Sequence, residues 1–320
     1  MRVKELIKPH FPLIFFYCQR RRIIKEINRC LAIPPDKYSD DLKDIYLKKI
    51  NRPLSLERPR AYTEKIQWSK LYNQNPIRSY LSDKYLVRNY VTEKIGSNYL
   101  IPLYGVWKKF DDIDFERLPN TFVLKTNNGS GTNIVIWDKR KINYRLVKSK
   151  LDFWTSIPFG YVNAYELHYN SIEPLIIAEK YLVDPIYKSL PDYKILCFNG
   201  KAHAVWVDMN RETDHRRNVY NLDWKLLPWT QKLPNYNGKI NKPKNFEKMI
   251  YIAETLSKGI SHVRVDLYNI NGCIFFGEMT FTNGSGLDAI YPDAFDFELG
   301  DLWDISKDRF PIKIPMEKND

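Results

Sequence analysis

The segment HVRVDLYNINGCIFFGEMTFTNGSG, residues 262–286, restricts the fold of this chain more than any other stretch. Apolar and polar residues alternate on both sides of a turn at residues 269–272, which predicts an antiparallel β hairpin. Alternation places Arg264 and Asp266 on one face of the first strand, and pairing can bring Glu278 of the second strand beside Asp266. Two opposed carboxylates repel unless a cation lies between them, and Mg²⁺ prefers such oxygen ligands. The pattern predicts either a Mg²⁺ site or an exposed hairpin whose acids face water or pair with arginine.

Length and composition narrow the class of protein. A chain of 320 residues can bury a substantial core, so two or three lobes are expected. With 44% hydrophobic and 28% charged residues, it fits neither the disordered nor the membrane-spanning class. Its four cysteines lie far apart without a CxxC pair, which disfavours a disulfide framework or a zinc site and indicates reduced thiols in a cytoplasm.

The net charge of +12 suits nucleic acid, an anionic membrane or a polyanionic small substrate such as ATP with an acidic sugar. The basic residues are scattered, and no helix-turn-helix, RNP or zinc-finger pattern accompanies them. We therefore expect no nucleic-acid partner.

Residues 1–32 form a basic and aromatic segment that is expected to be helical. Its apolar run, residues 11–18, is well short of the roughly 20 residues of a membrane span, and a basic triplet follows it in place of a signal-peptide cleavage site. In one interpretation its aromatic side chains enter a membrane interface while Arg20 to Arg22 and Lys25 face anionic head groups. In the other, the segment packs on the body of the protein. We expect a cytoplasmic protein, which the first interpretation would place at the inner face of the membrane.

Three further units are expected along the chain. Residues 33–118 indicate a mostly helical lobe, since apolar residues recur at helical spacing over 64–72 and Ser82-Asp83 can cap a helix that runs to Ile95. After Pro119, short apolar runs predict β-rich units over 119–190 and 191–310, followed by a tail, 311–320. Strands are expected at residues 122–124, 134–136, 175–178, 193–198, 202–207, 262–268 and 274–279, with a helix at 246–257. These elements predict an α+β fold with mainly antiparallel sheets.

The segment FVLKTNNGSGTNIVI, residues 122–136, predicts a second hairpin with a glycine-bearing loop. Such a loop can direct backbone N–H groups at phosphate oxygens while Lys125, at the end of the first strand, supplies a point charge. It lacks the residue order of a P-loop, so a simple tight hairpin is the alternative. The loop residues concerned are Asn128, Gly129, Ser130 and Gly131.

A third segment, LIIAEKYLVDPIYKSLPDYKILCFNG, covers residues 175–200. Its apolar strand leads into Glu179, Lys180, Tyr181 and Leu182, whose backbone groups can bond an adenine edge. Asp192 and Lys194 are two residues apart in a strand and so share a face, where one could accept from a ribose hydroxyl and the other contact a phosphate. A surface ion pair is the alternative for these two residues.

The order of these segments resembles the ATP-grasp superfamily, and the pattern of D-alanine–D-alanine ligase in particular. That pattern runs from a Lys and Gly/Ser loop through an E-K-x-L linker and an acidic strand residue to an R-x-D strand and a Glu-bearing strand. Upstream, RAYTEKIQWSKLY, LSDKYLVRNYV and YLIPLYGVW resemble the TupA-like ATP-grasp family of bacterial surface-polysaccharide clusters. The resemblance covers roughly Pro53 to Trp303.

The resemblance implies an ATP-grasp fold in which a helical N-terminal lobe and two α+β lobes clamp ATP. It implies an ADP-forming ligase that activates a carboxylate as an acyl phosphate and joins it to an amine. Arg264 would stabilise the oxyanion of the tetrahedral intermediate. Lys84, Lys125, Lys194 and Lys225 would surround the triphosphate, residues 179–182 would bind adenine, and Asp266 and Glu278 would hold two Mg²⁺ ions.

The last metal position departs from the pattern of such ligases. They usually have Glu-x-Asn there, whereas this chain has Glu278, Met279 and Thr280, with Asn283 three residues further on. A hydroxyl is a poorer ligand than an amide oxygen, so the second Mg²⁺ ion is expected either to be held by Asn283 or to bind weakly, with Thr280 as the other candidate ligand.

The substrate class comes from the family alone: an amino acid or small amine joined to a uronic acid of a capsule, O-antigen or cell-wall polysaccharide. A basic cluster would suit the uronate, and a solvated basic loop is its alternative. The cluster comprises Arg211, His215, Arg216 and Arg217. The competing functions are a glycosyltransferase, for which the acidic stretches at 39–41 and 111–114 could bind metal, and a non-catalytic carbohydrate- or nucleotide-binding protein.

Overall fold

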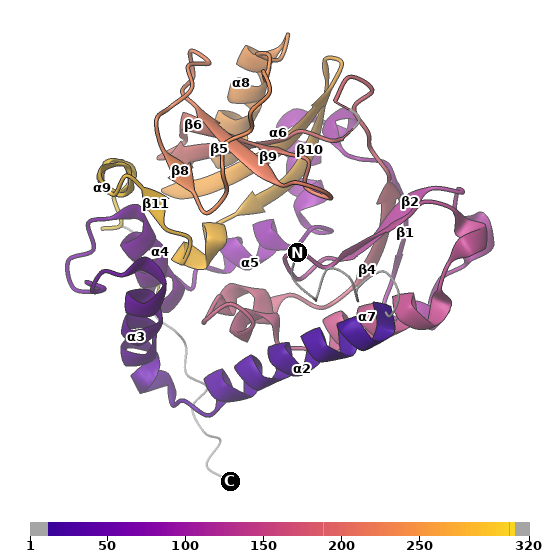
Figure 1. Ribbon diagram of the computed structural model, residues 1–320, viewed down its shortest axis with the longest axis horizontal. Coiled ribbons are helices and arrows are strands. Elements are labelled where there is room, and N and C mark those ends of the chain that lie inside the picture. Colours follow the sequence, from indigo (N-terminus) through magenta and orange to yellow (C-terminus); the bar gives the residue numbers. More distant parts are fainter. Residues whose placement is uncertain (1–11, 188, 307, 311–320) are drawn as a thin grey trace.

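The N-terminal lobe of the computed structural model, which describes residues 12–187, 189–306 and 308–310, is helical (Figure 1). The expected cap is found one turn early: Asp83 accepts hydrogen bonds from the backbone N–H groups of Tyr85 and Leu86, at 2.8 and 3.1 Å, in the turn that precedes the helix Val87–Ile95, and that helix itself has Leu86 at its N-cap. The expected tail, 311–320, and the first eleven residues lie outside the described residues. The helices are α2 (Pro12–Leu31), α3 (Tyr38–Ile50), α4 (Tyr62–Tyr72), α5 (Pro76–Ser82) and α6 (Val87–Ile95).

A four-stranded antiparallel sheet follows, in the order β1-β4-β2-β3. Helix α7 (Tyr144–Ser156) covers it, because Val147 and Leu151 pack against Phe122 and Leu124. The expected glycine hairpin is confirmed as β2 and β3. One strand, β1, lies within the range expected for the helical lobe. The strands are β1 (Leu103–Trp107), β2 (Phe122–Thr126), β3 (Asn133–Ile136) and β4 (Ile176–Lys180).

A five-stranded antiparallel sheet, in the order β10-β9-β5-β6-β7, forms the larger unit. One face packs on α8 (Phe246–Ser257), and the other packs on α4 and α9 (Ala294–Asp301). Beyond α4 and α9, that second face carries charged side chains instead of apolar ones. The strands are β5 (Asp192–Phe198), β6 (Lys201–Met209), β7 (Arg216–Tyr220), β9 (His262–Ile270) and β10 (Cys273–Thr280), with a separate pair of β8 (Thr230–Gln231) and β11 (Ile290–Tyr291).

A β-bulge at Gly277 sets the register of the β9–β10 hairpin. Phe276 pairs with Leu267 before the bulge, and Glu278 pairs with Asp266 after it. If the same residues paired without a bulge, Gly277 would oppose Asp266 and the Glu278 side chain would point to the other face of the sheet. A side chain at Gly277 would bring its Cβ to 3.1 Å from the Asp266 carbonyl oxygen, which favours glycine there.

Helix α2 lies along the outside of the molecule (Figure 1). Phe16 is buried edge-on against Phe153 of α7, with 5.9 Å between ring centroids, and the Arg20 guanidinium lies 5.2 Å from the same ring. This side of α2 therefore packs on the body, whereas Ile14 and Tyr17 remain 58% and 44% exposed. None of the described helices is long and apolar enough to cross a membrane.

Candidate functional site: a charged network on the large sheet

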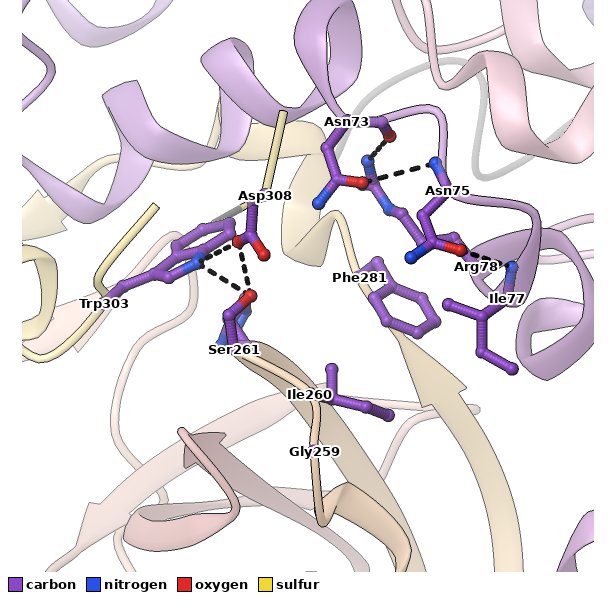
Figure 2. A pocket seen from close by; sticks show the side chains of 11 residues that line it. Asn73, Asn75, Ile77, Arg78, Gly259, Ile260, Ser261, Phe281, Trp303 and Asp308 are labelled. Atoms are coloured by element: carbon purple, nitrogen blue, oxygen red, sulfur yellow. Dashed lines mark hydrogen bonds between the residues drawn. The ribbon is translucent and has the colours of Figure 1, made fainter. Parts of the chain in front are cut away.

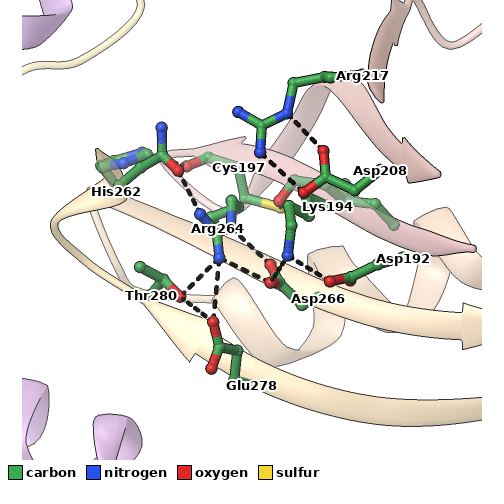
Figure 3. A network of polar contacts seen from close by, with 12 residues as sticks. Asp192, Lys194, Cys197, Asp208, Arg217, His262, Arg264, Asp266, Glu278 and Thr280 are labelled. Atoms are coloured by element: carbon green, nitrogen blue, oxygen red, sulfur yellow. Dashed lines mark hydrogen bonds and ion pairs between the residues drawn. The ribbon is translucent and has the colours of Figure 1, made fainter. Parts of the chain in front are cut away.

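Arg264 lies at the centre of a charged network on the large sheet (Figure 3). Its Nε and Nη2 donate to the two carboxylate oxygens of Asp266, at 2.6 and 2.7 Å, and Nη2 also lies 3.1 Å from Glu278 Oε1. Lys194 of the neighbouring strand donates to Asp266 Oδ2 at 2.5 Å. Arg264, Asp266 and Lys194 are all buried. The paired carboxylates that the sequence predicts on one face are therefore present, and cationic side chains lie between them.

The network continues to Asp192, at the start of β5. Its Oδ2 accepts hydrogen bonds from Lys194, at 2.6 Å, and from Arg211, at 2.5 Å. Its Oδ1 is buried and has no hydrogen-bond partner among the described residues. A buried carboxylate oxygen is costly to leave unpartnered, so this position suits a ligand donor such as a hydroxyl.

Asp208 lies directly opposite Asp192 on β6 and contacts two further members of the basic cluster, Arg217 and His215. Arg217 donates to both of its carboxylate oxygens, at 2.5 and 2.9 Å, and His215 Nε2 lies 3.2 Å from Oδ2. Burial alone would raise the pKa of Asp208, but the hydrogen bonds from Arg217 and His215 hold it well below its ordinary value. Asp208 was not predicted as a site residue.

On the small sheet, Lys125 and Glu179 occupy adjacent strands and form an ion pair of 2.6 Å, in which Glu179 is buried and Lys125 is partly buried. Arg88 of α6 lies 3.4 Å from the other oxygen of Glu179. The Glu179 carboxylate thus neutralises two cations, and Arg88 had not been singled out in the sequence.

The glycine loop contacts the helical lobe through Lys84. Its ammonium donates to the Gly129 carbonyl and lies 3.8 Å from Glu278 Oε2. Burial lowers the pKa of Lys84, and the proximity of Glu278 opposes this shift. Gly129 is required sterically, because a Cβ there would lie 2.5 Å from the Phe159 ring. Asn128 is buried and its Oδ1 has no partner among the described residues, whereas Ser130 and Gly131 are exposed.

The pKa of Glu278 is set by the cations around it. Partial burial would raise it, but Lys84 and Arg264 outweigh burial and hold the pKa well below its ordinary value. Glu278 is therefore an anion at neutral pH.

The linker residues that follow Glu179 differ in exposure. Lys180 is exposed, Tyr181 is half-buried with its ring edge-on to Trp137 at 4.7 Å, and Leu182 is buried. The linker adjoins the ion pair of Lys125 with Glu179, because Glu179 is its first residue.

Asn283 and Thr280 extend the network beyond Arg264. Arg264 donates to Asn283 Oδ1 and to Thr280 Oγ1, the latter at 3.1 Å. The Asn283 amide in turn donates to Gln231 Oε1 at 3.1 Å, and Gln231 is fully buried. Arg217 Nη1 reaches the same Gln231 oxygen at 3.4 Å, which links the basic cluster to Arg264.

Lys225 and Arg216, both predicted as cationic site residues, stand outside this network. Lys225 is exposed in the turn after β7, where its backbone bonds Asn221. Arg216 pairs with Asp214 at 2.9 Å, away from Asp208. Of the basic cluster, the structure brings together Arg211, His215 and Arg217.

The oxygen atoms near Arg264 fit a Mg²⁺ ion chemically. The Asp266 and Glu278 carboxylates, with Thr280 and Asn283, offer carboxylate, hydroxyl and amide oxygens, and the Arg264 guanidinium contacts all four side chains. A cation thus already lies where these oxygens converge. No cluster of three or more His, Cys, Asp or Glu side chains is arranged for a metal within the described chain. Mg²⁺ commonly takes only one or two carboxylates and completes its shell with phosphates and water.

A separate cavity of about 70 Å³ adjoins the far end of β9 (Figure 2). Arg78 lines one side, and Asp308 lies on the other, where its carboxylate accepts from Ser261 and from the Trp303 indole at 3.1 Å. None of the predicted site residues lines this cavity.

The chain matches the family model described as TupA-like ATPgrasp over residues 64–304, which is more than half of its length. It belongs to the TupA-like ATPgrasp family. Membership of this TupA-like family confirms the ATP-grasp assignment and the α+β fold class made from the sequence. No curated protein matches the chain.

Solved structures similar to this TupA-like ATPgrasp chain include complexes with ATP and with ADP. D-alanine–D-alanine ligase from Bacillus anthracis, complexed with ATP, has 15% identity and a TM-score of 0.38, covering 64% of this chain and 55% of the ligase. The ADP complex of PurK, N5-carboxyaminoimidazole ribonucleotide synthetase, has 13% identity and a TM-score of 0.36, covering 68% and 47%. The ATP-grasp ligase PsnB with minimal precursor, Mg and ADP has 9% identity and a TM-score of 0.35, covering 69% and 57%. The matched region thus spans about half the length of these proteins.

Proposed function

We propose that the protein is a Mg-ATP-dependent ligase that joins a carboxylate to an amine through an acyl phosphate. The observation that carries the proposal is the convergence of Lys194, Arg264, Asp266 and Glu278 on one end of the large sheet, with Lys84 linking Glu278 to the glycine loop. Family membership adds the expectation of ATP as the phosphate donor.

Each group has a role in this proposal. Lys84, Lys125 and Lys194 neutralise phosphate oxygens, the linker from Glu179 to Leu182 bonds adenine, and the free oxygen of Asp192 accepts from a ribose hydroxyl. A Mg²⁺ ion held by Asp266 and Glu278 would supply charge neutralisation between the phosphates.

The chemistry takes place in two steps. An oxygen of the substrate carboxylate attacks the γ-phosphorus, and the bond to the ADP oxygen breaks. The amine nitrogen then attacks the acyl carbon, the amide bond forms, and phosphate and a proton leave. Arg264, beside Asp266 and Glu278, would stabilise the oxyanion that exists after the amine has attacked and before phosphate leaves.

We further infer that the carboxylate belongs to a uronic acid and the amine to an amino acid or small amine, with the reaction in the cytoplasm, where ATP is available. Arg211, His215 and Arg217 support this substrate class, because a bound carboxylate could replace part of their pairing with Asp192 and Asp208. The uronic acid would be part of a capsule, O-antigen or cell-wall polysaccharide.

The decisive assay measures ADP release by the purified protein with Mg-ATP, with uronic acids crossed against amino acids. ADP release that requires both a uronic acid and an amine supports the ligase, whereas release with neither, or none with any pair, contradicts it. Lys125→Ala should abolish release, whereas Lys108→Ala, at an exposed lysine directly after β1 that pairs with Glu173, should not.

The glycosyltransferase alternative has weaker support from the structure. Of its two acidic stretches, Asp41 accepts from Arg29 and Tyr165, each at 2.7 Å, and Asp111 pairs with Lys148 at 2.6 Å. These contacts join neither carboxylate to the charged network around Arg264.

A further inference from the structure

Helix α2 presents an outward face with an unusual composition. Six exposed residues of α2, from Ile14 to Lys25, make up this face. At 100° per residue they fall within an arc of about 140°, opposite the side that packs on α7. Ile14 is 58% and Tyr17 44% exposed at the N-terminal end of this face, and cationic residues follow within two turns. The outer face of α2 comprises Ile14, Tyr17, Cys18, Arg21, Arg22 and Lys25, all exposed.

The charge of this outer face is of one sign. The single acidic residue of α2, Glu26, lies off the outer face and pairs with Arg29 at 2.8 Å. Arg21, Arg22 and Lys25 form no ion pair within the described part of the chain. Arg20, by contrast, lies over the Phe153 ring on the packed side. The three unpaired cations therefore remain available to an external anion.

We propose that the outer face of α2 docks on an anionic lipid bilayer. An exposed isoleucine and tyrosine favour the interface, where apolar side chains leave water and the tyrosine hydroxyl stays hydrated. Cations one or two turns further along the helix then lie at the level of the head groups. A nucleic acid would satisfy the cations but leave Ile14 exposed to water, so the combination favours a membrane surface.

The proposal depends on the folded helix and not on ligase activity. Phe16 and Arg20 pack on Phe153, so deleting the segment would uncover the core of α7 and confuse unfolding with loss of binding. Point substitutions on the outer face avoid this problem.

The test is co-sedimentation of the full chain with vesicles of phosphatidylglycerol and phosphatidylcholine in equal parts, and with pure phosphatidylcholine vesicles. We expect binding to the anionic vesicles alone, weakened by salt. Each basic residue near an anionic surface contributes about fivefold in partition, so Arg21→Glu with Arg22→Glu should weaken binding by roughly 30-fold or more. Failure of the wild-type protein to bind anionic vesicles, or equal binding to both vesicle types, would overturn the proposal.

The matched control is Lys48→Glu with Lys49→Glu, which changes the net charge equally at exposed positions on α3. This variant should bind like wild type. Equal losses in the two charge-reversed proteins would assign binding to the overall charge and not to α2.

The apolar part of the outer face is tested separately. Ile14→Ser with Tyr17→Ser should weaken binding about tenfold while keeping its salt dependence. Leu47→Ser, at an exposed position on α3, should leave binding unchanged. Melting temperatures of all variants establish that each is folded.

Discussion

Arg264 donates two parallel hydrogen bonds to the carboxylate of Asp266, two residues further along the same strand (Figure 3). Removal of the arginine would leave a buried carboxylate with Lys194 as its remaining ionic partner. We therefore expect Arg264→Ala to lower the free energy of unfolding by about 3 kcal/mol and turnover by roughly 10². Arg264→Lys should rescue little, since an ammonium cannot reproduce the bidentate contact.

A double-mutant cycle separates the two effects of Arg264. In the Arg264→Ala and Asp266→Asn double variant, the uncompensated charge is gone, so the loss of stability should be smaller than the sum of the single losses by about 1 kcal/mol or more. Urea unfolding and ATP turnover are measured on the same preparations. If the Arg264→Ala protein unfolds at a lower urea concentration but its turnover per folded molecule is normal, the role of the arginine is purely structural.

Gln231 is expected to act as a positioning residue through Asn283. Its side-chain oxygen holds the Asn283 amide so that the Asn283 oxygen faces Arg264. Gln231→Leu should lower kcat about tenfold with little change in the KM for ATP, because no nucleotide contact is lost. Gln231→Glu keeps the acceptor oxygen and should recover most of the rate. Identical kinetics for the two variants would contradict this role.

The bulge at Gly277 can be tested by deletion. Removing this residue should restore regular pairing, with Phe276 opposite Leu267 and Glu278 still opposite Asp266, so that Mg²⁺ still increases the affinity for an ATP analogue. Gly277→Ala should lower stability, since its Cβ would lie 3.1 Å from the Asp266 carbonyl oxygen without removing the bulge. Circular dichroism checks the fold of both. Loss of the Mg²⁺ effect in a folded deletion protein would show that the pairing of Glu278 with Asp266 is not sufficient for metal binding.

His262 should contribute to loss of stability in acid. It is fully buried between the Tyr62 hydroxyl and the Cys197 carbonyl, each 3.1 Å from a ring nitrogen, and burial lowers its pKa from 6.5 to about 3. Between these values the unfolded chain binds the extra proton, so the free energy of unfolding falls as pH is lowered below 6.5. His262→Gln should reduce that slope by about 1 kcal/mol per pH unit, measured by urea unfolding. His203→Gln, at an exposed position on β6, is the control and should change the slope far less.

The sequence was sufficient to predict the strands that carry the site, because each shows clear apolar alternation or an apolar run. The shared face of Arg264 and Asp266 follows from alternation alone and is confirmed. The pairing of Glu278 with Asp266 was predicted correctly but for an incomplete reason. A two-residue turn at residues 271–272 without a bulge would have placed Glu278 on the other face, and nothing in the alternation around Gly277 marks the extra residue.

The partners of the predicted residues could not be found from sequence. Arg88, Asp208 and Gln231 contact the site from elements far apart in the chain, and their contacts depend on how α6, β6 and β8 pack. The strand β7 was missed because its first residues, Arg216 and Arg217, are polar and were interpreted as part of a basic loop. The buried carboxylate of Asp208 compensates Arg217 there.

The pairing of each lysine with an internal carboxylate makes the site comparable to an ion exchanger. Lys125 is neutralised by Glu179, and Lys194 by Asp192 and Asp266. An incoming triphosphate has to displace these carboxylates, which then need a new counter-ion in a buried setting. A divalent cation bound by Asp266 would satisfy that need, so nucleotide and metal should each raise the affinity for the other. A monovalent anion such as chloride brings too little charge to replace these carboxylates, so we expect it to compete poorly with a nucleotide at the proposed site.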